Sequence, residues 1–436
     1  MTAVTTPAPT PFWWEAAKLA ELPEQPLPSE ADVVIVGAGY SGLGAAITFA
    51  RAGRSVLALD RQHAGEGAST RNGGITSGNI RPTAEALTRC FGADRALAIQ
   101  VEGKAAREDL YRFIAEEKID CDFHLSGRFS GAMTVKEYDA SARSADALAK
   151  ALGIESFGVP ESEQHRYIGT NLYRGGNVRM DVGGLHPGKF HSGMLRVALA
   201  AGAIVQGNTA VLSVEQNGKA FLVRTTRGEV RAGQVLVCTN GYTDASDRWL
   251  RRRLVPVRSR IIATEELPAD VMQKLMPALM MYSDSRKLSY YYRPSPDGRR
   301  ILFGGRDGTV NGDPAWPTDQ LREELVRIFP DLADTGLSHS WFGYVAMNRD
   351  MVPRLFTRDG ITYAAGYCGS GVVWAPWLGK KAALQMLGDR EGGQTAFNFR
   401  PPRAIPFFNG HPWFMPFVYA KLGFDDRRLM RERGRD

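Results

Sequence analysis

A glycine-rich turn between a buried strand and a helix constrains this fold more than any other feature of the sequence. Residues 32–36 are apolar after the first position, which predicts a strand buried on both faces of a parallel sheet. The motif Gly-Ala-Gly-Tyr-Ser-Gly follows at 37–42, and the pattern then predicts a helix over 41–52 and a second strand over 55–59. The sequence therefore opens on a βαβ unit.

Each glycine of this motif has a physical reason in a dinucleotide-binding turn. Gly37 permits the tight turn, Gly39 lets a pyrophosphate approach the backbone, and Gly42 allows the helix to pack closely on the sheet. Asp60 ends the second strand, where an acidic side chain accepts hydrogen bonds from an adenosine ribose. We predict dinucleotide binding; the alternative is a glycine turn with a purely structural purpose.

A second polar, glycine-rich loop follows the second strand at residues 67–74. Its backbone N–H groups, with Ser69, Arg71 and Asn72, are suited to holding a pyrophosphate and a flavin edge. From composition alone a flexible surface loop is the alternative.

This loop resembles the G-A-S-x-R-N-G-G signature of the D-amino-acid oxidase (DAO) superfamily of FAD-dependent oxidoreductases, and within that superfamily the chain resembles the gamma-glutamylputrescine oxidoreductase group. Further motifs occur in the order expected of that superfamily: Gly184–Pro187, Thr239–Thr243, Tyr291–Arg293, Phe303–Arg306, Trp341–Gly343 and Gly366–Gly371. The resemblance implies an α/β fold, with an FAD-binding Rossmann-like domain and a second, largely antiparallel substrate-binding sheet domain.

The resemblance also implies which residues bind FAD: Gly37, Gly39, Gly42, Asp60, Arg61, Ser69, Arg71, Asn72, Gly73, Gly74, Val211, Gly369, Ser370, Gly371 and Val372. The last four precede or open a helix, whose N-terminus stabilises negative charge on a reduced ring. Candidates for the substrate pocket are Tyr291, Arg306, Ser370, Val373 and Trp374, and no catalytic base is assigned.

Two departures from relatives shape the expected chemistry. Val373 stands where monomeric sarcosine oxidase has a lysine, so no cation for a substrate carboxylate is expected at that position. No cysteine lies within residues 341–353, where sarcosine oxidases carry the thiol that links flavin covalently. We therefore expect FAD to be bound non-covalently.

The expected organisation is discontinuous, with the FAD-binding domain at 31–90, 170–245 and 346–395, the substrate domain at 91–169 and 246–345, an N-terminal arm at 1–30 and a C-terminal tail at 396–436. Within the arm, prolines favour irregular structure, with Trp13 and Trp14 as anchors. Helices are predicted over 84–118 with a break at Gly92, over 139–152, and over 372–387 with an early interruption at Pro376. Strands are predicted within 204–237 and over 254–264, 289–293, 300–304 and 361–365.

Composition excludes several classes of function. The net charge of +7 is spread along the chain rather than gathered in a run, so nucleic-acid binding is not expected. Four distant cysteines, and a His186–His191 pair without a third ligand, do not predict a metal site. No signal peptide or transmembrane segment is recognisable, and a cytoplasmic location is expected.

The function that follows is oxidation of an amine C–N bond, in a secondary or N-substituted amine or an amino-acid derivative, to an imine that hydrolyses. Oxygen or another electron acceptor would reoxidise the flavin. A D-amino-acid or sarcosine-type oxidase is one alternative, and a flavin-containing non-catalytic subunit or assembly factor is another. The identity of the amine and the oligomeric state remain open at this point.

Overall fold

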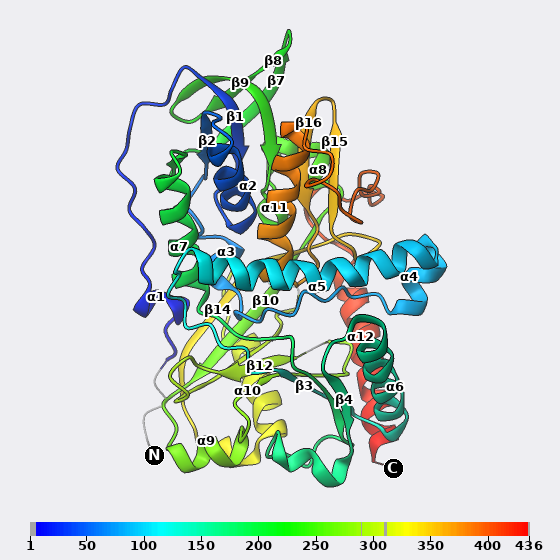
Figure 1. The fold of residues 1–436 in the computed structure, drawn as a ribbon. Helices are drawn as coiled ribbons and strands as arrows, with labels where there is room; N and C mark the ends of the chain where they lie inside the picture. Colours follow the sequence, from blue (N-terminus) through cyan, green and yellow to red (C-terminus); the bar gives the residue numbers. More distant parts are fainter. Residues whose placement is uncertain (1–5, 289, 309–311, 435–436) are drawn as a thin grey trace.

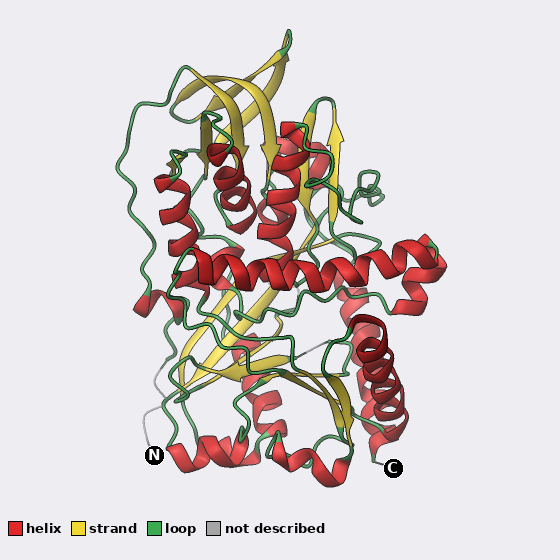
Figure 2. Ribbon diagram, viewed as in Figure 1, coloured by secondary structure: helices red, strands yellow, loops and turns green. Residues whose placement is uncertain are grey.

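Two eight-stranded sheets, one above the other, form the framework of the molecule (Figure 1). The computed structural model describes residues 6–288, 290–308 and 312–434. The upper half carries helices on its sheet, and the lower half is a sheet with helices beneath it (Figure 2). The expected fold class, a Rossmann-like α/β domain with a second, largely antiparallel sheet, is confirmed.

The first sheet contains the βαβ unit. Its strands lie in the order β15 (Arg354–Arg358), β16 (Ile361–Ala365), β9 (Gly228–Val237), β1 (Glu30–Val36), β2 (Val56–Leu59) and β6 (Ile204–Gln206), and β7 (Val211–Asn217) and β8 (Ala220–Thr225) extend β9 as a hairpin. The strands from β16 to β6 are parallel. The hairpin packs on one face of this parallel core, and helices cover the other.

The second sheet has the order β14 (Leu337–Met347), β10 (Val255–Thr264), β13 (Ile301–Arg306), β12 (Tyr291–Pro294), β11 (Met281–Asp284), β3 (Arg128–Gly131), β5 (Gly176–Arg179) and β4 (Ser156–Val159). Every pairing in it is antiparallel except β11 with β3. Of the strand expected over 289–293, Ser289 lies outside the described residues, and β12 begins at Tyr291.

The helices divide between the two halves. Those packed with the first sheet are α2 (Tyr40–Arg51), α5 (Ala93–Glu116), α7 (Pro187–Ala200) and α11 (Gly371–Leu387). The others are α1 (Trp13–Ala16), α3 (Ala68–Arg71), α4 (Ala84–Phe91), α6 (Val135–Leu152), α8 (Arg248–Arg251), α9 (Ala269–Leu275), α10 (Trp316–Ile328) and α12 (Met415–Arg433). Helix α5 crosses the molecule between the two sheets (Figure 1).

Close backbone contact between α2 and α11 fixes the centre of the first half. A side chain at Gly42 would overlap the carbonyl oxygen of Gly37, and one at Gly379 would overlap the carbonyl oxygen of Ser41. Small residues therefore let α2 approach both its own preceding turn and α11. As a result, both helices begin beside the same cavity.

Three elements differ from the sequence-based expectation. Helix α6 begins at Val135 rather than 139, because the Thr134 hydroxyl caps the N–H of Glu137. Helix α11 runs through Pro376 without interruption, since packing against Gly44 of α2 holds that turn in place. The C-terminal tail contains the 19-residue helix α12, whose buried Asp426 accepts hydrogen bonds from the N–H groups of Lys287 and Leu288.

Two elements also lie on the other side of the expected segment boundaries. Strand β5 pairs with β3 and β4 in the second sheet, although residues 170–245 were assigned to the FAD-binding segment. The buried face of α5 joins the core of the first half, although residue 91 was expected to open the substrate segment. Helical periodicity and strand composition do not reveal which sheet an element joins.

The expected irregular arm is pinned by its tryptophans. The indole N–H of Trp13 donates to the carbonyl of Asn72 at 2.8 Å, and that of Trp14 donates to the Thr70 hydroxyl at 3.0 Å. Trp13 is fully buried and belongs to the one-turn helix α1. Residues 1–5 of the arm lie outside the described residues.

The contact between α2 and α11 yields a stability prediction. We expect Gly379→Ala to lower the free energy of unfolding by about 1–3 kcal/mol, because the methyl group overlaps the Ser41 carbonyl. Thermal or denaturant unfolding of the holoprotein measures this change. The matched control is Gly423→Ala in α12, where there is room for a Cβ and alanine is the better helix former, so stability should hold or rise. Equal effects of the two substitutions would contradict the packing argument.

Candidate functional site

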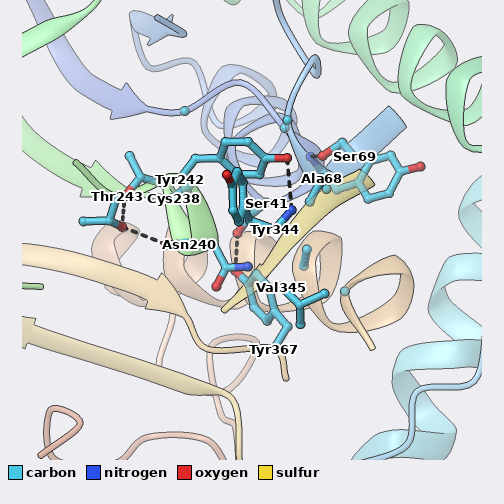
Figure 3. A pocket seen from close by; sticks show the side chains of 18 of the residues that line it. Ser41, Ala68, Ser69, Cys238, Asn240, Tyr242, Thr243, Tyr344, Val345 and Tyr367 are labelled. Atoms are coloured by element: carbon cyan, nitrogen blue, oxygen red, sulfur yellow. Dashed lines mark hydrogen bonds between the residues drawn. The ribbon is translucent and has the colours of Figure 1, made fainter. Parts of the chain in front are cut away.

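One continuous cavity of about 780 Å³ joins the glycine turn of the first half to the face of the second sheet. Figure 3 shows part of its wall, where Ser41, Ser69, Tyr242, Tyr344 and Tyr367 gather from both halves of the molecule. Apart from Gly42, every residue expected to bind FAD lines this cavity. Gly42 lies behind the turn and packs against the backbone of Gly37, as expected for the third glycine of the motif.

The glycine turn presents the N-terminus of α2 to the cavity. Gly37 has a φ of +104°, a conformation that side chains rarely adopt, so a glycine is required there. The Ser69 hydroxyl accepts a hydrogen bond from the N–H of Tyr40 at 3.0 Å. This contact ties the second glycine-rich loop to the helix start, where an anion is stabilised by exposed N–H groups and the helix dipole.

Asp60 lies at the carboxyl end of β2, within the cavity wall. Its Oδ2 accepts from the N–H of Ala38 at 3.0 Å and its Oδ1 from the N–H of Gln62 at 3.2 Å. Burial raises the pKa of Asp60 to about 6, because those two hydrogen bonds only partly offset the loss of water around the carboxylate. A ligand hydroxyl that donates to this carboxylate would favour its ionised form.

The loop expected to hold the flavin is rigidly supported. The side chain of Asn72 donates to the carbonyls of Ala68 and Ser69 and accepts from the N–H of Gly74 at 2.8 Å. The indole N–H of Trp341 donates to the Arg71 carbonyl at 2.9 Å, and Arg71 itself stacks on Trp14. Three indoles, counting Trp13 and Trp14, thus hold the α3 loop from outside.

The cavity continues to β7, near the place expected for adenine. Val211 lines it there, and Arg61 and Asp244, which also line the cavity, form an ion pair at 3.0 Å. Sequence reasoning did not identify Tyr242 and Tyr344, whose rings meet edge to face at 5.6 Å (Figure 3). Tyr242 lies within the motif Thr239–Thr243, and Tyr344 directly follows the motif Trp341–Gly343. Their position in or beside these family motifs was the only sequence signal that could have identified them.

The other end of the wall is formed by the start of α11. Residues Gly369, Ser370, Gly371 and Val372 line the cavity together with Tyr367, whose hydroxyl lies 2.7 Å from that of Ser41. The N-termini of α2 and α11 therefore both face this space. Two positive helix ends favour a ligand that carries negative charge at two separate places.

Val373 and Trp374 were expected in the substrate pocket, but the structure places both in the hydrophobic core behind it. Val372 and Ala375 line the cavity instead. Each helical residue turns about 100° from the last, so Val372 and Ala375 share one face while the two intervening side chains point away. Trp374 is fully buried, and its indole N–H donates to the Asn79 carbonyl.

The second sheet contributes a polar wall. Tyr291 and Arg306 line the cavity, as expected for the pocket, together with Ser259 and Ser283 from neighbouring strands. The Tyr291 hydroxyl lies 3.2 Å from that of Ser259, and its ring is held between Gly73 and Gly304. Burial raises the pKa of Tyr291, so the phenol stays protonated at neutral pH.

Two further arginines in this wall were not identified from the sequence. Arg128 is half-buried and donates to the Ser283 hydroxyl, and burial lowers its pKa to about 10. Arg81 is exposed where it lines the cavity, and its Nε donates to the Cys368 carbonyl at 2.9 Å. Loss of water, and then repulsion from Arg306, lower the pKa of Arg81 to about 10. Neither arginine lies in a recognisable motif, so only the folded chain places it here.

Within 6–288, 290–308 and 312–434, no group of three or more His, Cys, Asp or Glu side chains is arranged to hold a metal ion. In the same part of the chain, no helix is both long and apolar enough to cross a bilayer.

Comparison with known proteins identifies a family for this arrangement. Residues 32–385 match the family model DAO, described as FAD dependent oxidoreductase. The chain is 31% identical to the probable oxidoreductase OrdL of Rhizobium meliloti over 92% of both proteins. It is 29% identical to the gamma-glutamylputrescine oxidoreductase of Escherichia coli, over 89% of this chain and 90% of that protein.

The fold is shared with solved structures of low sequence identity. Glycine oxidase from Geobacillus kaustophilus superimposes with a TM-score of 0.70 at 20% identity, over 87% of this chain and all of that one. L-proline dehydrogenase from P. horikoshii gives 0.69 at 17% identity, over 91% of this chain and 99% of that one. These likenesses concern the fold.

The residues present fit FAD. A glycine turn at a helix N-terminus suits the pyrophosphate, Asp60 at the end of β2 suits the adenosine ribose, and the cavity continues past the α3 loop to the start of α11. The buried Asp60 carboxylate has acceptor capacity left after its two backbone hydrogen bonds.

We expect Asp60 to make FAD affinity depend on pH. Without the ribose its pKa is raised to about 6, and FAD prefers the ionised carboxylate, so the Kd for FAD should be level above about pH 7 and rise as the pH falls below 6. Asp60→Asn should weaken binding at pH 8 by about 1.5–3 kcal/mol and remove this dependence. Flavin fluorescence titration of the apoprotein measures both.

The control for this titration is Asp319→Asn, an exposed change in the first turn of α10 that should leave the curve unaltered. A pH slope that persists in Asp60→Asn would remove Asp60 from the ribose site.

The flavin should be extractable by acid. No cysteine lies at 341–353, where a covalent link would be expected. The two cysteines in the cavity wall are poor nucleophiles, because burial raises the pKa of Cys238 to about 12 and that of Cys368 to about 11. Trichloroacetic acid precipitation of the holoprotein should leave a white pellet and a yellow supernatant. Flavin retained in the pellet would show a covalent link.

Proposed function

The chain belongs to the DAO family of FAD-dependent oxidoreductases, and from this premise we propose that it oxidises the C–N bond of a secondary or N-substituted amine, or of an amino-acid derivative. The product is an imine that water hydrolyses. The observation that carries the proposal is the continuity of the cavity, which runs from the glycine turn to the polar face of the second sheet. An organic substrate on that face lies directly against the cofactor-binding half.

Names of relatives support an amine as the donor. The gamma-glutamylputrescine oxidoreductase and glycine oxidase that resemble this chain are named for an amine and an amino acid. When bound, FAD supplies the two-electron acceptor for a hydride from the carbon next to nitrogen. The protein's own contribution is to position the amine and to keep it neutral.

The residues of the second sheet suit that contribution. Tyr291 presents a protonated hydroxyl, oriented by Ser259, that can hydrogen-bond a substrate nitrogen or oxygen. Arg81, Arg128 and Arg306 surround the same space and disfavour an ammonium ion there, so the amine binds in the neutral form from which hydride leaves. The start of α11 stabilises negative charge that reduction places near it.

The preferred substrate is larger than a simple amino acid. Val373 provides no cation at the start of α11, and its side chain lies in the core, so the arginines beyond Tyr291 are the available partners for an acid group. A short substrate such as sarcosine or D-alanine reaches few of these groups. A longer N-substituted amine spans more of the cavity.

Anaerobic mixing of the holoenzyme with a panel of amines tests this function. We expect N-alkylated or gamma-glutamylated amines to bleach the visible flavin absorbance, with kcat/KM at least about tenfold above that for sarcosine or D-alanine, equivalent to about 1.4 kcal/mol. Turnover is measured with dioxygen and with an artificial acceptor. Photoreduction is the control that the flavin can accept electrons.

Two results would overturn the proposal. Sarcosine or D-alanine emerging as the best substrate would instead indicate a sarcosine-type or D-amino-acid oxidase. A flavin that photoreduces but that no amine reduces would favour a non-catalytic flavin subunit.

A further inference from the structure

Three arginine side chains line the end of the cavity next to the second sheet. Arg128 comes from β3, Arg306 from the end of β13, and Arg81 from the loop that precedes α4. The hydrogen bonds of Arg128 and Arg81 go to neutral groups, the Ser283 hydroxyl and the Cys368 carbonyl respectively. Among the described residues no acidic side chain forms an ion pair with any of the three.

Other arginines in or next to the same sheet form ion pairs with carboxylates. Arg258 and Arg260 pair with the buried Asp307, and Arg286 pairs with the buried Asp284. These buried arginines thus have a carboxylate partner, whereas the buried Arg293 of β12 donates to the backbone carbonyls of Leu185 and Pro294. A buried or half-buried cation without such a partner is costly, and a ligand carboxylate removes that cost.

The three arginines fall into two positions on opposite sides of Tyr291. Tyr291 is on β12, with β13 and Arg306 on one side, and β11 and then β3 with Arg128 on the other. The backbones of β13 and β3 are three strand spacings apart, or about 14 Å. Arg81 lies with Arg306, beside Cys368 and the start of α11.

We propose that the substrate is a secondary amine with two carboxylates, one bound by Arg81 and Arg306 next to the reacting carbon and the other bound by Arg128 at the far side of Tyr291. This inference rests on the proposed amine oxidation and names its substrate class. Guanidinium groups recognise carboxylates strongly, and two separate guanidinium positions select for the distance between the two carboxylates.

The reaction of such a substrate balances with one acceptor. The Cα–H bond breaks and its electron pair leaves as hydride to bound FAD, while the N–H proton passes to water and a C=N bond forms. Water then adds to the imine carbon and the C–N bond breaks, giving a 2-oxo acid and a primary amine that keeps the second carboxylate. Dioxygen or an artificial acceptor takes up the two electrons from the enzyme.

A matched pair of substrates isolates the second carboxylate. N-(3-carboxypropyl)alanine and N-propylalanine share the same oxidisable carbon and differ only in the distal acid group. For the wild-type holoenzyme we expect kcat/KM to be at least tenfold higher for the diacid. Arg128→Gln should remove this advantage by lowering kcat/KM for the diacid at least tenfold more than kcat/KM for N-propylalanine, and Arg128→Lys should restore part of it.

Two further variants serve as controls for this experiment, one at the Arg81–Arg306 position and one on the surface. Arg306→Gln should lower kcat/KM for both substrates, because both carry the proximal carboxylate. Arg427→Gln, an exposed change on α12 far along the chain from the cavity residues, should alter neither.

A second readout does not depend on turnover. Heptanedioate has the same spacing of carboxylates and no amine, and it should perturb the flavin absorbance of the holoenzyme at concentrations at least tenfold below those needed for heptanoate. Arg128→Gln should abolish this difference. If heptanedioate behaves so although no amine reduces the flavin, the carboxylate site stands and the proposed oxidation fails.

The inference is overturned if the wild-type enzyme has the same kcat/KM for the two substrates and binds heptanoate as tightly as heptanedioate. It is also overturned if Arg128→Gln lowers kcat/KM for both substrates equally. In either case amine oxidation itself would remain intact.

Discussion

Close contact between the backbones of α2 and α11 is the constraint on which the site depends. Gly42 admits the turn that precedes α2, and Gly379 admits α2 itself. Any larger residue would push the two helices apart and turn their N-termini away from each other. Because the contact is kept, two positive helix ends face one cavity, and a dinucleotide with negative charge at both its pyrophosphate and its reduced ring is accommodated by the backbone alone.

The sequence predicts the cofactor half well because that half depends on local rules. A strand, a glycine turn, a helix and an acid at the next strand end must follow each other in order, so Gly37, Gly39 and Asp60 are recognisable before folding. The same applies to the loop at 67–74, where the Asn72 side chain bonds to the backbone of the loop itself.

The substrate half was less predictable because it is assembled from distant segments. Arg128 and Arg81 reach the cavity from a short strand and an irregular loop, and nothing in their neighbouring residues indicates this. Val373 and Trp374 were assigned to the wrong face of a helix, since the start of α11 was recognised but the direction of its faces was not. The α6 start, by contrast, had a local signal in the Thr134–Glu137 cap.

The balance of charge along the cavity connects these two halves. At the end beside β7, two arginines of the cavity wall have carboxylate partners: Arg61 pairs with Asp244, and Arg358 pairs with Asp359. At the second sheet, the described residues offer no acid to Arg128. This difference supports the proposal that the cations beyond the flavin loop serve to bind the substrate. On that proposal, selection between amines rests on their acid groups, and FAD chemistry common to the family acts on whichever amine those groups hold in place.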